Sequence, residues 1–319
     1  MQLLSVQDRE TVEAKATRAA LGETLIELVG EGADIMAVDA DLSGSTTTAK
    51  FAKAYPERFS NAGIAEQNMI GIAAGLALTG STVFTGSFAA FGTGRVYDQI
   101  RNTVCASNLD VKVTPTHAGI SVGPDGGSHQ MLEDLALMCA APGMRVLAPS
   151  DYHSAKAALR LAAETAGPVY VRLSRAKFPQ LYAAGGTFAL GGSQVLREGG
   201  DITLLACGYE VHEALKAAGE LERRGVDAEV IDLLSIKPLD EDTIVASASK
   251  TGRVVCAEEH MLNGGLGSRV AQVLARSHPV PMAFIGIDDR FGQSGGFGEL
   301  LSAYQLDCGA IVEAALSLL

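Results

Sequence analysis

The sequence predicts an α/β protein of two domains, each with a mostly parallel sheet flanked by helices. Short apolar segments of strand length alternate with longer helical patterns in both halves, as parallel βαβ units require. A stretch rich in Gly and Pro at residues 178–192 separates the two patterns. With 319 residues, the chain is long enough for two domains. We expect domains at residues 1–180 and 193–319, joined by a linker at residues 181–192.

The composition is that of a globular protein, with 47% hydrophobic residues and a net charge of −12. No basic run offsets the negative charge, which argues against nucleic acid as a partner. No apolar run has the length and purity of a membrane span, and the first residues lack the layout of a signal peptide. The five cysteines are scattered and never spaced as Cys-x-x-Cys, which is typical of a reducing compartment. We therefore expect a cytoplasmic protein that binds neither nucleic acid nor a membrane.

The first expected elements are a helix at residues 11–29 and a strand at residues 35–38. Arg18 lies inside the helix, where a solvated charge is the simplest interpretation. The strand leads into Asp39 and then into the hydroxyl-rich residues 43–48. Such a segment at a strand end is either an anion-binding loop or a set of helix caps.

Residues 58–78 dominate the first half, because every residue from Met69 to Leu78 is apolar or glycine. A helix that is apolar all round is expected to be buried on all sides. Glu66 stands at the start of this helix, with no Lys or Arg near it in sequence. Its carboxylate is either a first-turn charge favoured by the helix dipole or a desolvated functional acid.

The next strand, at residues 82–85, leads to Phe88 and Phe91, which are three residues apart and can share one face. Core packing is the usual role of such a pair. Two aromatic rings at a strand end also form a stacking surface for a flat ligand ring.

A strand at residues 111–116 ends at His117, and a glycine-rich segment with Asp125 and His129 follows before a helix at residues 131–140. Two histidines and an aspartate held close at a strand end favour a polar site. No further ligand stands at a zinc-type spacing, so we expect no metal site on this chain.

Strands at residues 145–148 and 168–174 flank a helix at residues 151–165. The second strand delivers Arg172 and Arg175, which need not act together because side chains alternate along a strand. The second half of the chain contains strands at residues 202–207, 228–233, 253–257 and 283–287 and helices at residues 210–224, 240–249 and 267–276.

Gly264 to Gly267 open a helix and resemble half of a dinucleotide-binding fingerprint. Several residues separate them from the preceding strand, whereas the fingerprint requires a tight strand-to-helix turn. Close packing of the helix start is the better interpretation of these glycines.

In this order, the segments resemble the carboxyl-terminal subunit of a split transketolase almost from end to end. Such a subunit has a pyrimidine-binding domain and a Rossmann-like carboxyl-terminal domain, without the diphosphate-binding domain. Each motif is weak alone, but their joint order is specific. The motifs are GIAEQN at residues 63–68, Phe88 with Phe91, GPDGGSHQ at residues 123–130, LSR at residues 173–175, IKPLD at residues 236–240 and the segment from Glu258 to Gly267.

The resemblance implies thiamine diphosphate as the cofactor. Glu66 matches the acid that hydrogen-bonds the cofactor's aminopyrimidine ring. Phe88 and Phe91 match the aromatic wall beside that ring. Leu42, with Asp41 next to it, matches the contact that helps to hold the cofactor bent.

The resemblance also implies phosphorylated sugars as substrates. His117, Asp125 and His129 match residues that bind the hydroxyls and carbonyl of sugar donors and acceptors. Both histidines, together with Glu66, are the expected catalytic residues. The residues that match the phosphate-binding set are Arg18, Ser45 and Arg175.

Three departures from the family concern cofactor packing and the choice of acceptor. Pro124 stands where the family usually has Glu, and Ala118 with Gly119 replaces an Asp-Ser pair. Gly94 stands where a third aromatic residue is common near the pyrimidine.

The family's magnesium-diphosphate motif, Gly-Asp-Gly followed by Asn, is absent from the sequence. We therefore expect an N-terminal transketolase subunit to carry the Mg²⁺ ligands, in a heterotetramer of two copies of each chain. The expected reaction is transfer of a two-carbon ketol unit from a ketose phosphate to an aldose phosphate. One alternative is the beta subunit of a thiamine-dependent 2-oxoacid dehydrogenase. Another, of a different class, is a non-catalytic nucleotide-binding or regulatory subunit.

Overall fold

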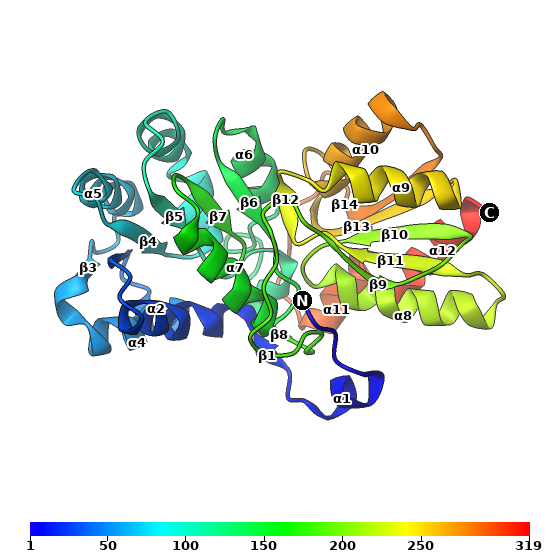
Figure 1. Cartoon of the computed structure of the whole chain (residues 1–319), viewed down its shortest axis with the longest axis horizontal. Helices are drawn as coiled ribbons and strands as arrows, with labels where there is room; N and C mark the ends of the chain where they lie inside the picture. Colours follow the sequence, from blue (N-terminus) through cyan, green and yellow to red (C-terminus); the bar gives the residue numbers. More distant parts are fainter.

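The computed structural model describes residues 1–319, apart from the side chains of Val6 and Glu10. The chain forms two α/β lobes that lie side by side (Figure 1). The first lobe contains a seven-stranded sheet in the order β12-β6-β7-β5-β4-β2-β3, parallel except where β12 meets β6. Its strands are β2 (Ile35–Asp39), β3 (Phe59–Asn61), β4 (Thr82–Gly86), β5 (Val111–Val113), β6 (Arg145–Leu147), β7 (Val169–Val171) and β12 (Ser235–Lys237).

Helices cover both faces of this sheet. One face packs against α2, α4 and α7, and the other against α5 and α6. The helices of the first half are α1 (Val6–Thr11), α2 (Ala20–Gly30), α3 (Ser43–Thr46), α4 (Thr48–Ala54), α5 (Glu66–Leu78), α6 (Asp134–Ala140) and α7 (Tyr152–Glu164). Asp151 caps α7 by accepting a hydrogen bond from the Ser154 N–H at 2.6 Å, which fixes where this helix starts.

The helix predicted at residues 11–29 is wrong at its start. The short strand β1 (Lys15–Ala16) pairs antiparallel with β8 (Lys177–Phe178), and α2 begins only at Ala20. Pairing with a segment far along the chain overrides local helical preference here. As a result Arg18 sits beside the end of β7, where its N–H donates to the Ser174 carbonyl.

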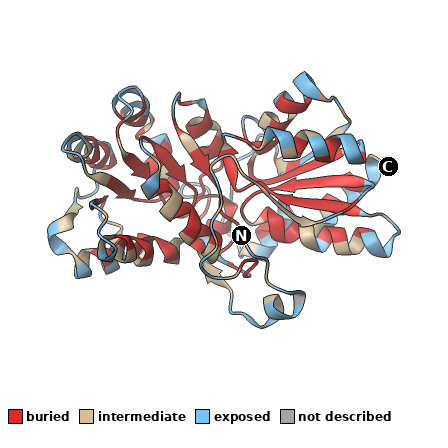
Figure 2. Ribbon diagram, in the orientation of Figure 1, coloured by how far each residue is buried: buried red, intermediate tan, exposed pale blue. Residues whose placement is uncertain are grey.

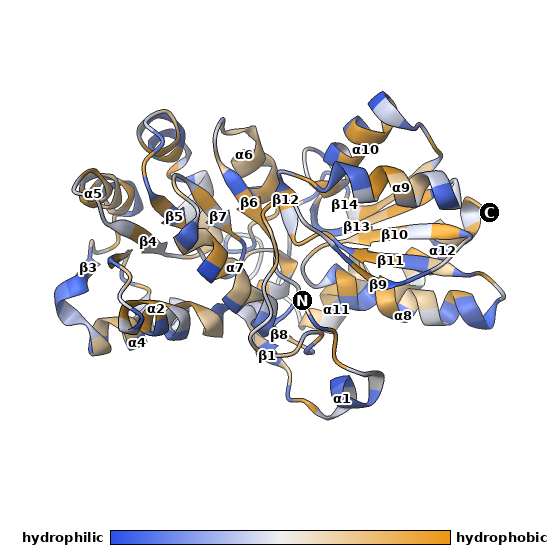
Figure 3. Cartoon of the chain, viewed as in Figure 1, coloured by the Kyte–Doolittle hydropathy of each residue, from blue (hydrophilic) through white to orange (hydrophobic). Residues whose placement is uncertain are grey.

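The second lobe contains a five-stranded sheet in the order β14-β13-β10-β11-β9, parallel except where β9 meets β11. Apolar strands lie between helices whose outer sides are more hydrophilic (Figure 3). The strands are β9 (Gln194–Arg197), β10 (Ile202–Ala206), β11 (Ala228–Asp232), β13 (Val254–Met261) and β14 (Met282–Ile287). The helices are α8 (Glu210–Arg223), α9 (Glu241–Thr251), α10 (Leu266–Ser277), α11 (Phe297–Ala303) and α12 (Cys308–Ser317). The predicted fold class is therefore confirmed.

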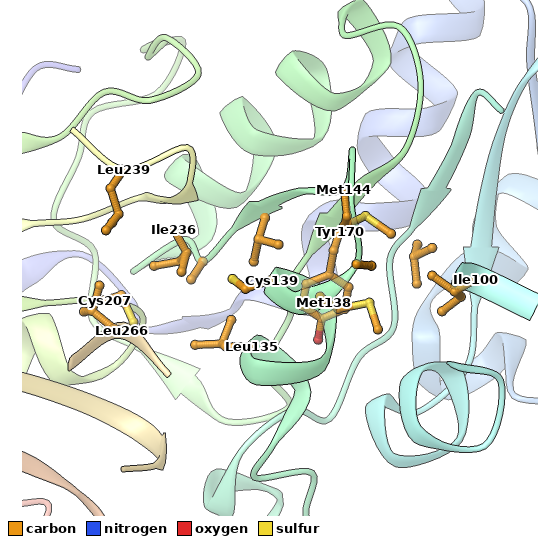
Figure 4. Close-up of a cluster of buried hydrophobic side chains, with 14 of the residues drawn as sticks. Ile100, Leu135, Met138, Cys139, Met144, Tyr170, Cys207, Ile236, Leu239 and Leu266 are labelled. Carbon is orange, nitrogen blue, oxygen red and sulfur yellow. The ribbon is translucent and has the colours of Figure 1, made fainter. Parts of the chain in front are cut away.

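One apolar cluster runs through the junction of the two lobes (Figure 4). Met138 and Tyr170 of the first lobe belong to the same cluster as Cys207 and Leu266 of the second. In addition, β12 comes from the second half of the sequence but extends the first sheet. An apolar junction of this kind holds two domains in a fixed relation. The domain limits given above stay a prediction.

The expectation that α5 is buried on all sides is wrong for this chain. Met69 and Ala73 face the sheet and are buried, but Gly71, Gly75 and Leu78 are exposed. Leu78 is 75% exposed. The helix lies at the end of the first lobe that is farthest from the second sheet, and part of its surface is open to solvent (Figures 1 and 2). No helix among the described residues is long and apolar enough to cross a membrane.

Candidate functional site

The residues singled out from the sequence gather at one edge of the first sheet. Strands β2, β3, β4, β5 and β7 are parallel, so their carboxyl ends meet at this edge. Ligands of open α/β sheets bind outside these strand ends. The segments that follow the strands carry, in chain order, Asp41, Glu66, Phe88, His117 and Arg175.

His117 forms the centre of the cluster and is buried, with a relative exposure of 2%. Its ring stacks on Phe88 with centroids 3.8 Å apart. Nε2 lies 3.4 Å from Arg18 Nη1, and Nδ1 lies 2.7 Å from Thr116 Oγ1. Because guanidinium only donates, Nε2 must accept, and the ring proton stays on Nδ1. Burial, followed by the charges of Arg18 and Arg175, lowers the pKa of His117 to about 3, so the ring is neutral.

Two guanidinium groups flank this histidine. Arg18 Nη1 donates to the Ser45 carbonyl at 2.7 Å, whereas Arg175 Nη1 donates to the Val122 carbonyl at 2.9 Å and to Asp125 Oδ1 at 2.8 Å. Burial and then the charge of Arg175 lower the pKa of Arg18. The two cations therefore repel each other, which an anion bound between them would relieve. Arg172 does not join this group, because it pairs with buried Asp134, in agreement with the expectation that the two arginines need not act together.

The aromatic pair lies next to this charged group. The rings of Phe88 and Phe91 are 6.2 Å apart and close to parallel, at 18°. His129 meets Phe91 edge-on, with centroids 5.3 Å apart, and its Nδ1 lies 2.9 Å from Ser128 Oγ. The structure thus joins the two aromatic residues and the two histidines in one set of ring contacts.

Glu66 is the first residue of α5 and is 3% exposed. Arg95 Nη1 donates to Glu66 Oε2 at 2.9 Å, and the same guanidinium lies 4.5 Å from the centre of the Phe91 ring. The sequence interpretation did not include Arg95. Its spacing of four residues from Phe91, about one helical turn, signalled only the contact with the Phe91 ring and not the pairing with Glu66.

Asp41 and Leu42 follow β2 at the same edge. Asp41 is exposed and has a φ of 63°, and its backbone N–H and carboxylate both bond the Asn61 side chain at 3.1 Å. Leu42 donates its N–H to the buried carboxylate of Asp39 at 2.7 Å. Both residues are therefore held in place through the ends of β2 and β3.

Several hydroxyls of the segment after β2 form hydrogen bonds within the protein and are not free to bind an anion. The Thr46 and Thr48 hydroxyls each donate to Asp39 Oδ2 at 2.8 Å. Burial raises the pKa of Asp39, and these bonds satisfy its carboxylate. Ser45, the candidate anion contact in this segment, touches Arg18 because its carbonyl oxygen accepts a hydrogen bond from the guanidinium.

The glycine-rich helix start in the second lobe is already filled by a side chain. The N–H groups of Leu266 and Gly267 donate to the Glu258 carboxylate at 2.6 and 2.9 Å. A Cβ on Gly265 would lie 2.1 Å from Glu258 Oε2. An internal carboxylate therefore takes the place that a phosphate would need, and this loop gives no support to a nucleotide-binding function.

Comparison with known families identifies both halves of the chain. Residues 13–180 match the transketolase pyrimidine binding domain, and residues 191–311 match the transketolase C-terminal domain. The chain belongs to the transketolase family. A protein of Methanocaldococcus jannaschii, provisionally named as a transketolase C-terminal section, is 49% identical over 92% of this chain and 93% of its own length. A 6-deoxy-6-sulfo-D-fructose transketolase subunit of a Clostridium species is 41% identical over 95% of both chains.

Among solved structures, the chain is similar to a split-gene transketolase described as an inactive beta4 tetramer. That structure has a TM-score of 0.88 and 44% identity, and the match covers 96% of this chain and 98% of the other. The resemblance to the C-terminal subunit of a split transketolase is confirmed, and the 2-oxoacid dehydrogenase alternative is not favoured. The roles assigned to individual transketolase site residues stay predictions.

Membership of the transketolase family implies dependence on thiamine diphosphate, and the site fits the pyrimidine part of this cofactor. A buried carboxyl at Glu66 suits the polar edge of an aminopyrimidine, and the flat faces of Phe88 and Phe91 suit its ring. Among the described residues, there is no group of three or more His, Cys, Asp or Glu side chains placed to hold a metal ion.

Proposed function

We propose that this chain is the C-terminal subunit of a thiamine-diphosphate-dependent transketolase that transfers a two-carbon ketol unit from a ketose phosphate to an aldose phosphate. The observation that carries the proposal is the convergence of Arg18, His117 and Arg175 at the ends of three separate segments. Such a group suits a sugar that has hydroxyls at one end and a dianion at the other.

The two arginines, with Ser45, form the proposed phosphate site. Guanidinium groups match the oxygens of a phosphate and keep their charge throughout the physiological pH range. On a chain with a net charge of −12, a local pair of cations is needed to attract an anion at all. Their mutual repulsion in the free site adds to the gain on binding.

His117, Asp125 and His129 form the proposed sugar site between the phosphate site and the aromatic wall. Neutral His117 presents Nε2 as an acceptor, so it can take a hydrogen bond from a substrate hydroxyl in place of the one from Arg18. Asp125 is held by Arg175, which couples the hydroxyl contact to the phosphate contact. Transfer of a group between a sugar and the cofactor requires that several fixed groups orient the sugar.

When bound, thiamine diphosphate supplies the carbanion that accepts and donates the ketol unit. Glu66 would hold a proton at its carboxyl group against the pyrimidine edge, and Phe88 and Phe91 would fix the plane of that ring. Asp41 and Leu42 would contact the cofactor from the end of β2. The diphosphate and Mg²⁺ would be held by the partner subunit, as the sequence predicts.

The partner we propose is an N-terminal transketolase subunit, and the exposed side of α5 is the surface it would cover. Ile64, two residues before this helix, and Leu78 at its last residue are 81% and 75% exposed, and Gly71 and Gly75 between them leave open space above the backbone. Glu66 starts the same helix, so a subunit seated there would also close the cofactor site. The solved beta4 tetramer, described as inactive, supports a need for a second kind of subunit. Two copies of each chain is the proposed assembly.

We place the protein in the cytoplasm. None of the cysteines among the described residues is paired, and four of them are buried. Unpaired buried cysteines fit a reducing compartment.

The decisive experiment measures ketol transfer by the chain alone and after addition of the N-terminal subunit, thiamine diphosphate and Mg²⁺. We expect activity only in the complete mixture. Acceptors and donors should include phosphorylated sugars, their sulfonated counterparts and unphosphorylated glycolaldehyde. Transfer by the lone chain would refute the partner requirement. A complete mixture that transfers no ketol unit with any of these substrates would refute the function.

A further inference from the structure

The loop that carries the proposed sugar ligands is held in place by the other lobe. We call residues 119–130 the site loop, since they include Asp125 and His129 and the Val122 carbonyl that holds Arg175. We call residues 289–296, between β14 and α11, the supporting loop. The two loops are far apart in sequence and lie against each other.

Two side-chain hydrogen bonds join these loops. Gln130 Nε2 donates to the Gln293 carbonyl at 2.9 Å and also reaches the Ile120 and Gly123 carbonyls within its own loop. Ser294 Oγ donates to the Pro124 carbonyl at 2.7 Å, directly beside Asp125. Gln130 is 5% exposed, so its bonds are made away from water and are costly to leave unmade.

The backbones of the two loops also touch. A Cβ on Gly292 would lie 1.8 Å from Gln130 Oε1, and a Cβ on Gly127 would lie 2.5 Å from the Gly292 carbonyl oxygen. Neither glycine has a positive φ, so space and not backbone conformation requires glycine at both positions. A side chain at residue 292 would force the buried Gln130 amide to shift, and with it the hydrogen bond to Gln293 that joins the two loops.

The start of the site loop has a second support from the same lobe. Glu259 of β13 is buried, and its carboxylate accepts a hydrogen bond from the Ser121 N–H. Ile120 packs in the same apolar cluster as Leu300 of α11. The second lobe therefore holds both ends of the site loop, although it carries none of the proposed site residues.

We propose that the second lobe positions the site loop. Gln130 is the positioning residue, and Gly292 is the position that must stay without a side chain. The expected loss of ketol transfer rests on the proposed function. The expected loosening of the site loop does not. The proposal predicts that the second lobe sets the geometry of Asp125, His129 and Arg175 together.

The test compares Gly292→Ala with the matched control Gly298→Ala. Gly298 lies six residues further on, in α11, and a Cβ there would meet nothing within 4 Å. Amide hydrogen exchange in residues 119–130 is measured on the full-length chain, and kcat and KM are measured on the reconstituted complex. Gly292→Ala should speed exchange in the site loop by about 10-fold and lower kcat/KM by about 10- to 100-fold, as expected for ligands displaced by about 1 Å. Gly298→Ala should change neither quantity.

The loss in Gly292→Ala should fall on phosphorylated acceptors and on glycolaldehyde alike, because Asp125 and His129 move with the loop. Ser294→Ala removes one hydrogen bond without adding bulk, and should give a smaller change of the same kind if Gly292→Ala fails to fold. Unchanged exchange in the site loop for both variants would overturn the proposal. If wild-type complex transfers no ketol unit, the proposed function fails, whereas the exchange measurement still decides the positioning role.

Discussion

Arg95 contacts both the Glu66 carboxylate and the Phe91 ring, the two groups against which the proposed cofactor ring would bind. Its Nη1 donates to Glu66 Oε2 at 2.9 Å, and its guanidinium lies over the Phe91 ring. Glu66 is buried, whereas the Arg95 side chain is 48% exposed, so the arginine is the partner that can move into solvent. In the free chain this pair keeps a buried carboxylate from being left without a counter-charge.

Glu66→Gln tests the role of that carboxyl. The amide has the same shape but cannot exchange a proton with a pyrimidine, so ketol transfer in the reconstituted complex should fall by about 100-fold or more. Proton exchange at the reactive carbon of the bound cofactor should slow in parallel, whereas the dissociation constant of the cofactor should change less. Glu57→Gln, at an exposed residue outside the site, is the control. Unchanged proton exchange in Glu66→Gln would make Glu66 a structural charge.

Arg175→Ala tests the proposed phosphate site. A charge-assisted contact contributes about 1.5–3 kcal/mol, so KM for phosphorylated acceptors should rise by about 10- to 100-fold with a small effect on kcat. Glycolaldehyde, which has no phosphate, should be transferred almost normally. Lys177→Ala removes a nearby exposed cation that pairs with Glu13 and should leave both acceptors unaffected. Equal losses for both acceptors in Arg175→Ala would show that Arg175 only supports the Asp125 loop.

The neutral state of His117 predicts how stability depends on pH. Its pKa is lowered to about 3 in the folded chain, whereas an unfolded histidine has its ordinary value near 6.5. Between these values the unfolded chain binds more protons, so the free energy of unfolding falls as the pH drops from about 6.5 towards 3. His117→Asn should reduce this pH dependence by up to about one proton, measured by denaturant unfolding at several pH values. His212, whose pKa burial lowers to about 4, contributes in the same direction and should retain its share in the variant. An identical slope for variant and wild type would contradict a neutral His117.

Gly75→Ala tests the exposed side of α5 as the surface for the partner. A Cβ at this residue meets nothing within the chain, and Ala favours a helix over Gly by about 1 kcal/mol, so the isolated chain should become slightly more stable. Association with the N-terminal subunit should weaken by about 10- to 100-fold, because an added methyl group overfills a close contact. Gly219→Ala in α8 has the same open space and should stabilise the chain without this loss. Titration calorimetry on both variants separates the two effects, and tight binding by Gly75→Ala would place the partner elsewhere.

Much of the site could be predicted from the sequence, because its residues follow apolar strands. Parallel strands bring the segments after them to one edge, and the resemblance to transketolases assigned Glu66, Phe88, His117 and Arg175 to a common site before any contact was known. Three features could not be found this way. Arg95 reaches Glu66 across 29 residues, Gln130 reaches Gln293 across 163 residues, and β12 joins a sheet of the other lobe.

The sequence by itself determined the α/β fold class, the positions of most apolar strands and helices, and which segments follow the strand ends. Each of these depends on local composition and periodicity, which neighbouring residues record. The tertiary structure alone decided that Arg95 pairs with Glu66, that one side of α5 stays open, that Glu258 fills the glycine-rich helix start and that the second lobe supports the site loop. These are contacts between distant segments, and their energy depends on burial and distance in three dimensions, for which one-dimensional spacing carries no signal.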